Sequence, residues 1–156
     1  MSANPVSALE RVSLGHRRVT TAITIQAPPD VVWSVLTDWA SLPEWSSSIQ
    51  SVEGEIRDGS DVVFRYLFRG SVNVVPHSLI YREGEAFGWS DPFLPGVSDN
   101  HLFRLETLPD GNTRFHQTDE VKGGIVSMLV GWLFARWFLE SYVEFNLKLK
   151  ERVESR

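Results

Sequence analysis

The feature that most constrains this chain is a long stretch of two-residue alternation that gives way to helical spacing. From residue 49 to residue 122, apolar and polar side chains alternate in short runs, separated by turn-forming residues such as Gly70 and Gly84. Alternation with this period is typical of strands that bury one face, and short turns join such strands in antiparallel order. The pattern predicts a loop at residues 92–96 and strands at residues 49–56, 61–68, 73–82, 85–90, 101–108 and 113–122.

A single long helix is predicted after these strands. Gly123 and Gly124 end the alternation, and apolar side chains then recur at helical spacing over residues 125–153. The first half of this segment, residues 125–139, is strongly apolar, but a membrane span needs about 20 predominantly apolar residues. We therefore expect no span, and a helix that is covered by the sheet or by a partner.

The N-terminal part predicts one more strand and two short helices. The expected elements are a strand at residues 19–27, a helix at residues 30–39 and a second helix at residues 42–45. Pro29 suits the first turn of the first helix, where a missing N–H removes no hydrogen bond. Because residues 1–16 show no periodicity, we expect a loose extension there and one ligand-binding domain over residues 17–156.

This order of elements predicts an α+β fold. A curved antiparallel sheet of about seven strands cannot cover its own apolar concave face, so the long helix should lie across that face and leave an internal cavity. The six Trp, nine Phe and three Tyr residues supply more ring surface than short strands need, and such rings often line ligand cavities. Plain core packing is the alternative for any single ring.

Charge and cysteine content exclude several classes of partner. The net charge is -5 at pH 7 without a basic run, which argues against a nucleic-acid partner. The absence of cysteine removes disulfides, thiolate nucleophiles and Cys-based metal sites. The four histidines show no paired helical spacing and no glycine-rich nucleotide motif is present, so we expect no metal and no cofactor. Residues 1–15 contain no apolar h-region, so we expect no signal peptide and a cytoplasmic location.

Two stretches of the chain carry a family resemblance. The first reads Ile-Gln-Ala-Pro-Pro-Asp-Val-Val-Trp over residues 25–33 and is followed by Leu-Pro-Glu-Trp at residues 42–45. The second joins a Pro-Asp-Gly turn to a strand, a glycine break and the long helix. Together they resemble START-like proteins with the helix-grip fold, in the polyketide cyclase/dehydrase and lipid-transport branch. The resemblance implies a scaffold that hosts hydrophobic-ligand carriers, hormone receptors and aromatase/cyclases.

The Pro-Asp-Gly turn predicts a register for the last two strands. A three-residue loop would pair Leu108 with Asn112. Counting back gives further pairs on one face, namely Leu105 with Phe115, Phe103 with Gln117, and His101 with Asp119. We therefore expect His101 beside Asp119 at one end of the cavity, as a candidate catalytic acid–base pair. The alternatives are an exposed ion pair at the strand ends, and a two-residue loop that would put the two residues on opposite faces.

Alternation also selects the side chains expected to line the cavity. From the sheet these are Phe64, Tyr66, Trp89, Phe103, Leu105, Phe115 and Gln117. From the long helix they are Trp132, Arg136 and Leu139, which belong to a stripe that would roof the cavity. Arg136 would meet an acidic group on a ligand or extend to water.

Three functions fit these observations. The first is binding of a hydrophobic small molecule, such as a lipid, an isoprenoid or an aromatic or polyketide-like compound, for storage, transport or sensing. The second is a cofactor-free cyclase or dehydratase in which His101 and Asp119 move protons. The third is an interaction module or homodimer that docks through the long helix by way of Val126, Val130, Phe134, Trp137 and Phe138.

Overall fold

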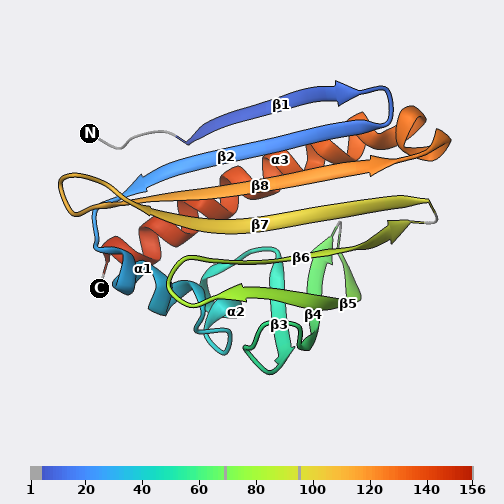
Figure 1. Ribbon diagram of the computed structural model, residues 1–156. Coiled ribbons are helices and arrows are strands. Elements are labelled where there is room, and N and C mark those ends of the chain that lie inside the picture. Colours follow the sequence, from blue (N-terminus) through green and yellow to red (C-terminus); the bar gives the residue numbers. More distant parts are fainter. Residues whose placement is uncertain (1–4, 69, 95, 156) are drawn as a thin grey trace.

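One antiparallel sheet wraps around a long helix (Figure 1). The computed structural model describes residues 5–68, 70–94 and 96–155. The strands are β1 (Val6–Ser13), β2 (His16–Ile25), β3 (Ile49–Gly54), β4 (Asp61–Phe68), β5 (Ser71–Arg82), β6 (Ala86–Leu94), β7 (Val97–Thr107) and β8 (Thr113–Gly123). The helices are α1 (Pro29–Leu36), α2 (Leu42–Trp45) and α3 (Ile125–Glu154). The strands are ordered β1-β2-β8-β7-β6-β5-β4-β3, so the predicted α+β helix-grip fold is confirmed, with eight strands where about seven were expected.

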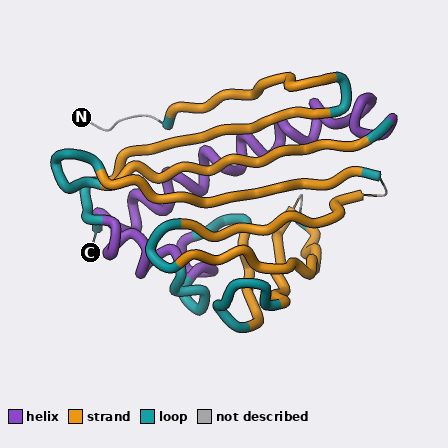
Figure 2. The backbone as a smooth tube through the Cα atoms, in the orientation of Figure 1, coloured by secondary structure: helices purple, strands orange, loops and turns teal. Residues whose placement is uncertain are grey.

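α3 lies along β2 on one face of the sheet (Figure 2). Near the start of the helix, Ser127 Oγ donates a hydrogen bond to the carbonyl of Gly15 at 2.8 Å. Farther along, Asn146 Nδ2 donates to Thr21 Oγ1 at 3.1 Å. Both elements therefore run in the same direction, and α3 makes further contacts with β8, β1, α1 and α2.

The two halves of α3 meet the sheet through different side chains. In the first half the buried residues are Ser127, Gly131 and Ala135, which are four positions apart on one helix face. A Cβ on Gly131 would lie 2.9 Å from Ser127 Oγ, which belongs to the preceding turn of the same helix. In the second half the buried residues are Phe145, Asn146, Leu149 and Val153. Of the large apolar side chains of the first half, Ile125, Leu129 and Trp132 are exposed.

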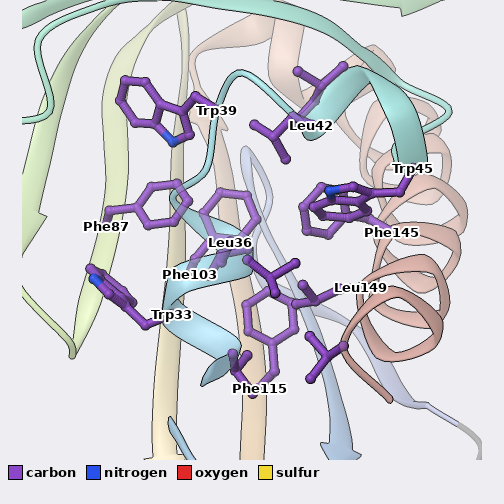
Figure 3. Close-up of a cluster of buried hydrophobic side chains, with 14 of the residues drawn as sticks. Trp33, Leu36, Trp39, Leu42, Trp45, Phe87, Phe103, Phe115, Phe145 and Leu149 are labelled. Carbon is purple, nitrogen blue, oxygen red and sulfur yellow. The ribbon is translucent and has the colours of Figure 1, made fainter. Parts of the chain in front are cut away.

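α1 and α2 cover the end of the core where β2 and α3 finish (Figure 1). α1 ends at Leu36, earlier than predicted, and its C-cap is Thr37, whose backbone N–H and hydroxyl both donate to the Trp33 carbonyl. The tryptophans of this region still join the core, as Figure 3 shows. The ring centroids lie 5.9 Å apart for Trp33 and Phe87, 6.0 Å for Trp39 and Phe64, and 5.1 Å for Trp45 and Phe145.

The sheet begins earlier in the chain than the sequence pattern predicts. A loose extension is predicted over residues 1–16, whereas Val6–Ser13 form β1 and pair with β2. All eight residues of β1 are exposed, so no alternation of apolar and polar side chains marks this strand. The prediction was therefore wrong for residues 6–13.

β6 and β7 are also longer than predicted. A loop is predicted at residues 92–96, but pairing continues to Leu94, opposite Val97, with Pro92 opposite Ser98. Residue 95 of the predicted loop lies outside the described residues. Proline lacks an N–H and is rare inside a sheet, which is why it indicated a loop. The register shifts directly after the proline, between Pro92 and Leu94. As a consequence, Asp99 belongs to a strand.

Candidate functional site

The turn between β7 and β8 determines which side chains face α3. The Leu108 N–H donates to the Asn112 carbonyl at 2.8 Å, which closes the predicted three-residue loop, and Gly111 takes a left-handed φ of 82°. The strand pairs that follow are the predicted ones, namely Leu105 with Phe115, Phe103 with Gln117, and His101 with Asp119. The predicted register is therefore confirmed.

His101 and Asp119 are cross-strand neighbours, but their side chains have different partners. His101 Nε2 lies 3.0 Å from Gln117 Oε1, and Gln117 Nε2 donates to the Tyr142 carbonyl at 3.1 Å. Because a backbone carbonyl only accepts hydrogen bonds, the Gln117 amide must turn its Oε1 toward the imidazole. His101 Nε2 therefore carries the proton. The expectation of an imidazole held by a carboxylate was wrong, because the Gln117 amide takes that place.

The Gln117 amide belongs to a buried hydrogen-bond chain that links four elements. Gln117 Nε2 also donates to Asn146 Oδ1 at 2.5 Å, and Asn146 in turn donates to Thr21 Oγ1 at 3.1 Å. These three side chains are fully buried, on β8, α3 and β2 respectively. Hydrogen bonds in such a low-dielectric environment are strong and restrict the groups that they join. The chain therefore holds His101, on β7, in one tautomer and one orientation.

His101 is neutral over the physiological pH range. Its ring stacks on Tyr142 with centroids 4.3 Å apart, and the rings of Phe103 and Trp89 lie 4.3 Å and 5.1 Å away. Burial lowers the pKa of His101 to about 3, although the hydrogen bond to Gln117 acts in the opposite direction. A neutral ring with a proton on Nε2 keeps its lone pair on Nδ1, which can accept a hydrogen bond or a proton.

Asp119 is fully buried and interacts with a tyrosine. Tyr142 Oη donates to Asp119 Oδ2 at 2.7 Å, and the Asn100 N–H donates to Oδ1 at 3.2 Å. Burial raises the pKa of Asp119 to about 6, and the two hydrogen bonds partly oppose this effect. Burial, and then the charge of Asp119, hold the pKa of Tyr142 well above its ordinary value. The carboxyl group is thus poised to change charge near neutral pH.

Aromatic rings line the inner face of the sheet from β7 to β4. The rings of Phe64 and His77 each lie 4.7 Å from Trp89, and Phe64 stacks on Tyr66 at 5.5 Å. Most of the predicted sheet residues lie in this interior: Phe64, Trp89, Phe103, Phe115 and Gln117 are buried, and Tyr66 and Leu105 are half-buried against the core. That they contact a ligand remains a prediction.

The predicted residues of α3 divide into two groups. Leu139 is half-buried. Trp132 is 52% exposed, and the Arg136 side chain is 65% exposed beside Glu140. The expectation that Trp132 roofs an enclosed cavity was therefore wrong, and Arg136 takes the second of its two expected positions, in water. The small-residue face centred on Gly131 packs on the sheet instead and turns both side chains outward.

The structure adds polar groups that the sequence reasoning missed. His77 is buried on β5, where alternation with Leu79 would have placed it on the inner face. Asp99 is buried near Tyr142, whose pKa it helps to raise, but it falls outside the strand predicted at residues 101–108. The indole N–H groups of Trp39 and Trp45 are buried, and within the described part of the chain they have no acceptor.

The interior carries carboxyl groups without buried cations. Among the residues whose exposure is described, no Lys or Arg is buried, whereas Asp99 and Asp119 are. Over the described ranges, no three His, Asp or Glu side chains gather as the ligands of a metal ion would. None of the described helices combines the length and the apolar character that crossing a bilayer requires.

The fold is shared with several solved structures. The Zhui aromatase/cyclase from Streptomyces sp. R1128 superposes with a TM-score of 0.70 at 20% identity, covering 90% of this chain and 95% of that one. The protein TTHA0849 from Thermus thermophilus gives 0.69 at 19% identity, over 88% and 97%. A START superfamily protein from Mycobacterium smegmatis gives 0.65 at 18% identity, over 88% and 97%. At these identities the likeness shows a common fold and nothing more.

Sequence comparison identifies the family. No curated protein matches the chain significantly. The profile of the family described as polyketide cyclase / dehydrase and lipid transport, however, matches residues 16–154, which is nearly the whole chain. The matched region runs from β2 to the end of α3 and includes every residue of the buried hydrogen-bond chain. The protein therefore belongs to the polyketide cyclase/dehydrase and lipid transport family.

Proposed function

We propose that this protein binds a hydrophobic small molecule, of lipid, isoprenoid or aromatic polyketide-like character, between α3 and the inner face of the sheet. The observation that carries the proposal is the buried chain from Thr21 through Asn146 and Gln117 to His101. This chain presents a neutral imidazole in a fixed orientation among aromatic rings, and a ligand hydroxyl would meet the lone pair on Nδ1. The family membership supports a site of this kind.

The indole donors support the same proposal. Trp39 and Trp45 bring buried N–H groups to the other end of the core (Figure 3). A buried donor without an acceptor is unfavourable by about 1–3 kcal/mol. A carbonyl or hydroxyl oxygen on a bound molecule would remove that penalty. The expected ligand is therefore apolar over most of its length, with an oxygen substituent at one or both ends.

Native mass spectrometry of freshly purified protein tests the proposal. We expect an added mass that is lost on denaturation, and solvent extraction should then identify its chemical class. His101→Ala should weaken binding by about tenfold, the equivalent of one hydrogen bond. The matched control is His116→Ala, because His116 is on the outer face with Glu106 at 2.8 Å, and its removal should leave binding unchanged. A protein that carries no extra mass and takes up no hydrophobic fluorescent probe would contradict the proposal.

Acid–base catalysis of a cyclisation or dehydration is the second candidate, and one observation favours it. Burial raises the pKa of Asp119 to about 6, so this carboxyl group can both donate and accept a proton near neutral pH. His101, with a pKa near 3, is a weak base, so we assign proton transfer to Asp119 assisted by Tyr142. Turnover of an aromatic polyketone should then follow a pH profile with an inflection near 6 that disappears in Asp119→Asn. Turnover that is equal in wild type and Asp119→Asn would exclude this role.

A further inference from the structure

One side of the molecule carries large apolar side chains in water. The first half of α3 exposes Ile125 by 75%, Leu129 by 70% and Trp132 by 52%, and β1 exposes Leu9 by 40%. Leu9 pairs with Val19, which is buried on the inner face of the sheet, and α3 contacts β1, so Leu9 and α3 lie on the same side of the sheet. Monomeric proteins rarely leave a contiguous surface of this kind uncovered.

The flank of α3 that carries Trp132 faces the β1 edge of the sheet. Trp132, Leu139 and Asn146 are seven residues apart and therefore share one flank of the helix. Asn146 reaches Thr21 on β2, and Lys150, one turn later, donates to the Thr24 carbonyl on β2 at 2.8 Å. This flank thus points toward β2, and the next strand in that direction is β1.

β1 is a free edge of the sheet. It pairs with β2 on one side, and in the described part of the chain no strand pairs with its other side (Figure 1). A long exposed edge presents a row of backbone donors and acceptors that invites a further strand, and natural proteins usually block such edges. β1 is eight residues long and lies at the border of the apolar flank.

We propose that β1 pairs antiparallel with β1 of a second copy, about a two-fold axis at Leu9. Antiparallel pairing about a two-fold axis perpendicular to the sheet brings one residue opposite its own copy. Centring on Glu10 or on Arg11 would place like charges directly opposite each other, which is unfavourable. Centring on Leu9 instead pairs Leu9 with Leu9, Val6 with Val12, Ala8 with Glu10 and Ser7 with Arg11. In this register apolar residues lie opposite each other at Leu9 and at Val6 and Val12, and no two like charges are directly opposite.

The same axis covers the flank of α3. Both copies of α3 lie on the same face of the joined sheet, and each directs its Trp132 flank toward the axis and the other copy. A bilayer surface would also cover apolar side chains, but hydrocarbon offers no partner for the backbone groups of an edge strand. The charged residues Glu10 and Arg11 on β1 also disfavour burial in lipid. A second copy satisfies the strand edge and the helix flank together.

The mass in solution tests the proposal. Analytical ultracentrifugation should show reversible dimers of the 17.7 kDa chain. Leu9→Lys opposes two lysines at the axis and should raise the dissociation constant by about tenfold or more, and Trp132→Glu should also raise it. The matched control is Val74→Lys, because Val74 is exposed on β5, away from this edge, and this variant should dimerise as wild type does. A monomer at all concentrations, or a dimer that Leu9→Lys leaves intact, would overturn the proposal.

Single cysteines test the register, because the chain has no cysteine of its own. Leu9→Cys places two thiols directly opposite each other, with Cβ atoms about 5 Å apart, close to the reach of a disulfide. Ala8→Cys and Glu10→Cys would each oppose a different residue of the second copy. Under mild oxidation we expect Leu9→Cys to form the covalent dimer fastest. Faster cross-linking of either neighbour would refute the two-fold axis at Leu9.

Discussion

The opposed pKa shifts of His101 and Asp119 predict a pH dependence of stability that single substitutions reveal. The ordinary pKa of Asp119 is 3.8, and burial raises it to about 6. The ordinary pKa of His101 is 6.5, and burial lowers it to about 3. Between about pH 4 and pH 6, folding therefore takes up a proton at Asp119 and releases one at His101.

The two effects have opposite signs and equal slopes. A carboxyl group with a raised folded-state pKa stabilises the fold less as the pH rises through this window, by about 1.4 kcal/mol per pH unit. A histidine with a lowered pKa stabilises the fold more as the pH rises, by the same amount. In the wild type the two slopes cancel. In His101→Gln the unfolding free energy should fall by about 3 kcal/mol from pH 4 to pH 6 relative to wild type, and in Asp119→Asn it should rise by about as much.

Urea denaturation followed by tryptophan fluorescence at several pH values measures these slopes. Wild type, the two single variants and the double variant share every other titrating group. The contribution of those groups therefore drops out when each variant is compared with wild type. The double variant should regain the pH dependence of the wild type, which a general loss of stability would not produce. Parallel curves for wild type and both single variants would show that the two side chains titrate alike in the folded and unfolded states, and would refute the reasoning.

Two further substitutions probe the contacts around these groups. Tyr142→Phe removes a hydrogen bond to the Asp119 carboxylate, so the pKa of Asp119 should rise further and stability at neutral pH should fall by about 1–3 kcal/mol; an NMR titration of the Asp119 carboxyl carbon checks the direction. Gly131→Ala brings a Cβ to within 2.9 Å of Ser127 Oγ, so the gain of about 1 kcal/mol that alanine gives inside a helix should be reduced in the wild-type background and recovered in a Ser127→Ala background. Equal changes in both backgrounds, measured by urea denaturation, would show that this contact has no effect.

The sequence predicted strands correctly where successive residues alternate between buried and exposed positions. The last hairpin alternates fully, and its Pro-Asp-Gly loop suits one length, so the pairing of His101 with Asp119 followed from the sequence. β1 gave no such signal, because both of its faces are exposed. The continuation of β6 through Pro92 was equally hidden, since proline is ordinarily a sign of a strand end.

The sequence predicted which site residues are neighbours within the sheet, because the strand register determines them, but not their contacts with α3. Which partner His101 takes depends on α3, because the Tyr142 carbonyl orients Gln117 and the Tyr142 hydroxyl binds Asp119. The placement of α3 depends in turn on its buried small residues Ser127, Gly131 and Ala135, the first of which donates a hydrogen bond to the Gly15 carbonyl. Apolar periodicity ranks large side chains first and therefore assigned the inward position to Trp132, which lies outside.

The energetics of Asp119 bear on why the carboxyl group is there. Above about pH 6 it is ionised in a fully buried position, and the pKa shift of about two units corresponds to roughly 3 kcal/mol of lost stability. An asparagine would avoid this loss, and a leucine would also remove the need for partners, so packing alone does not explain the residue. Tyr142 and the Asn100 N–H reduce the penalty without removing it. A destabilising acid beside an oriented, neutral imidazole is the arrangement expected where a ligand or a proton transfer, rather than the fold, determines the residue.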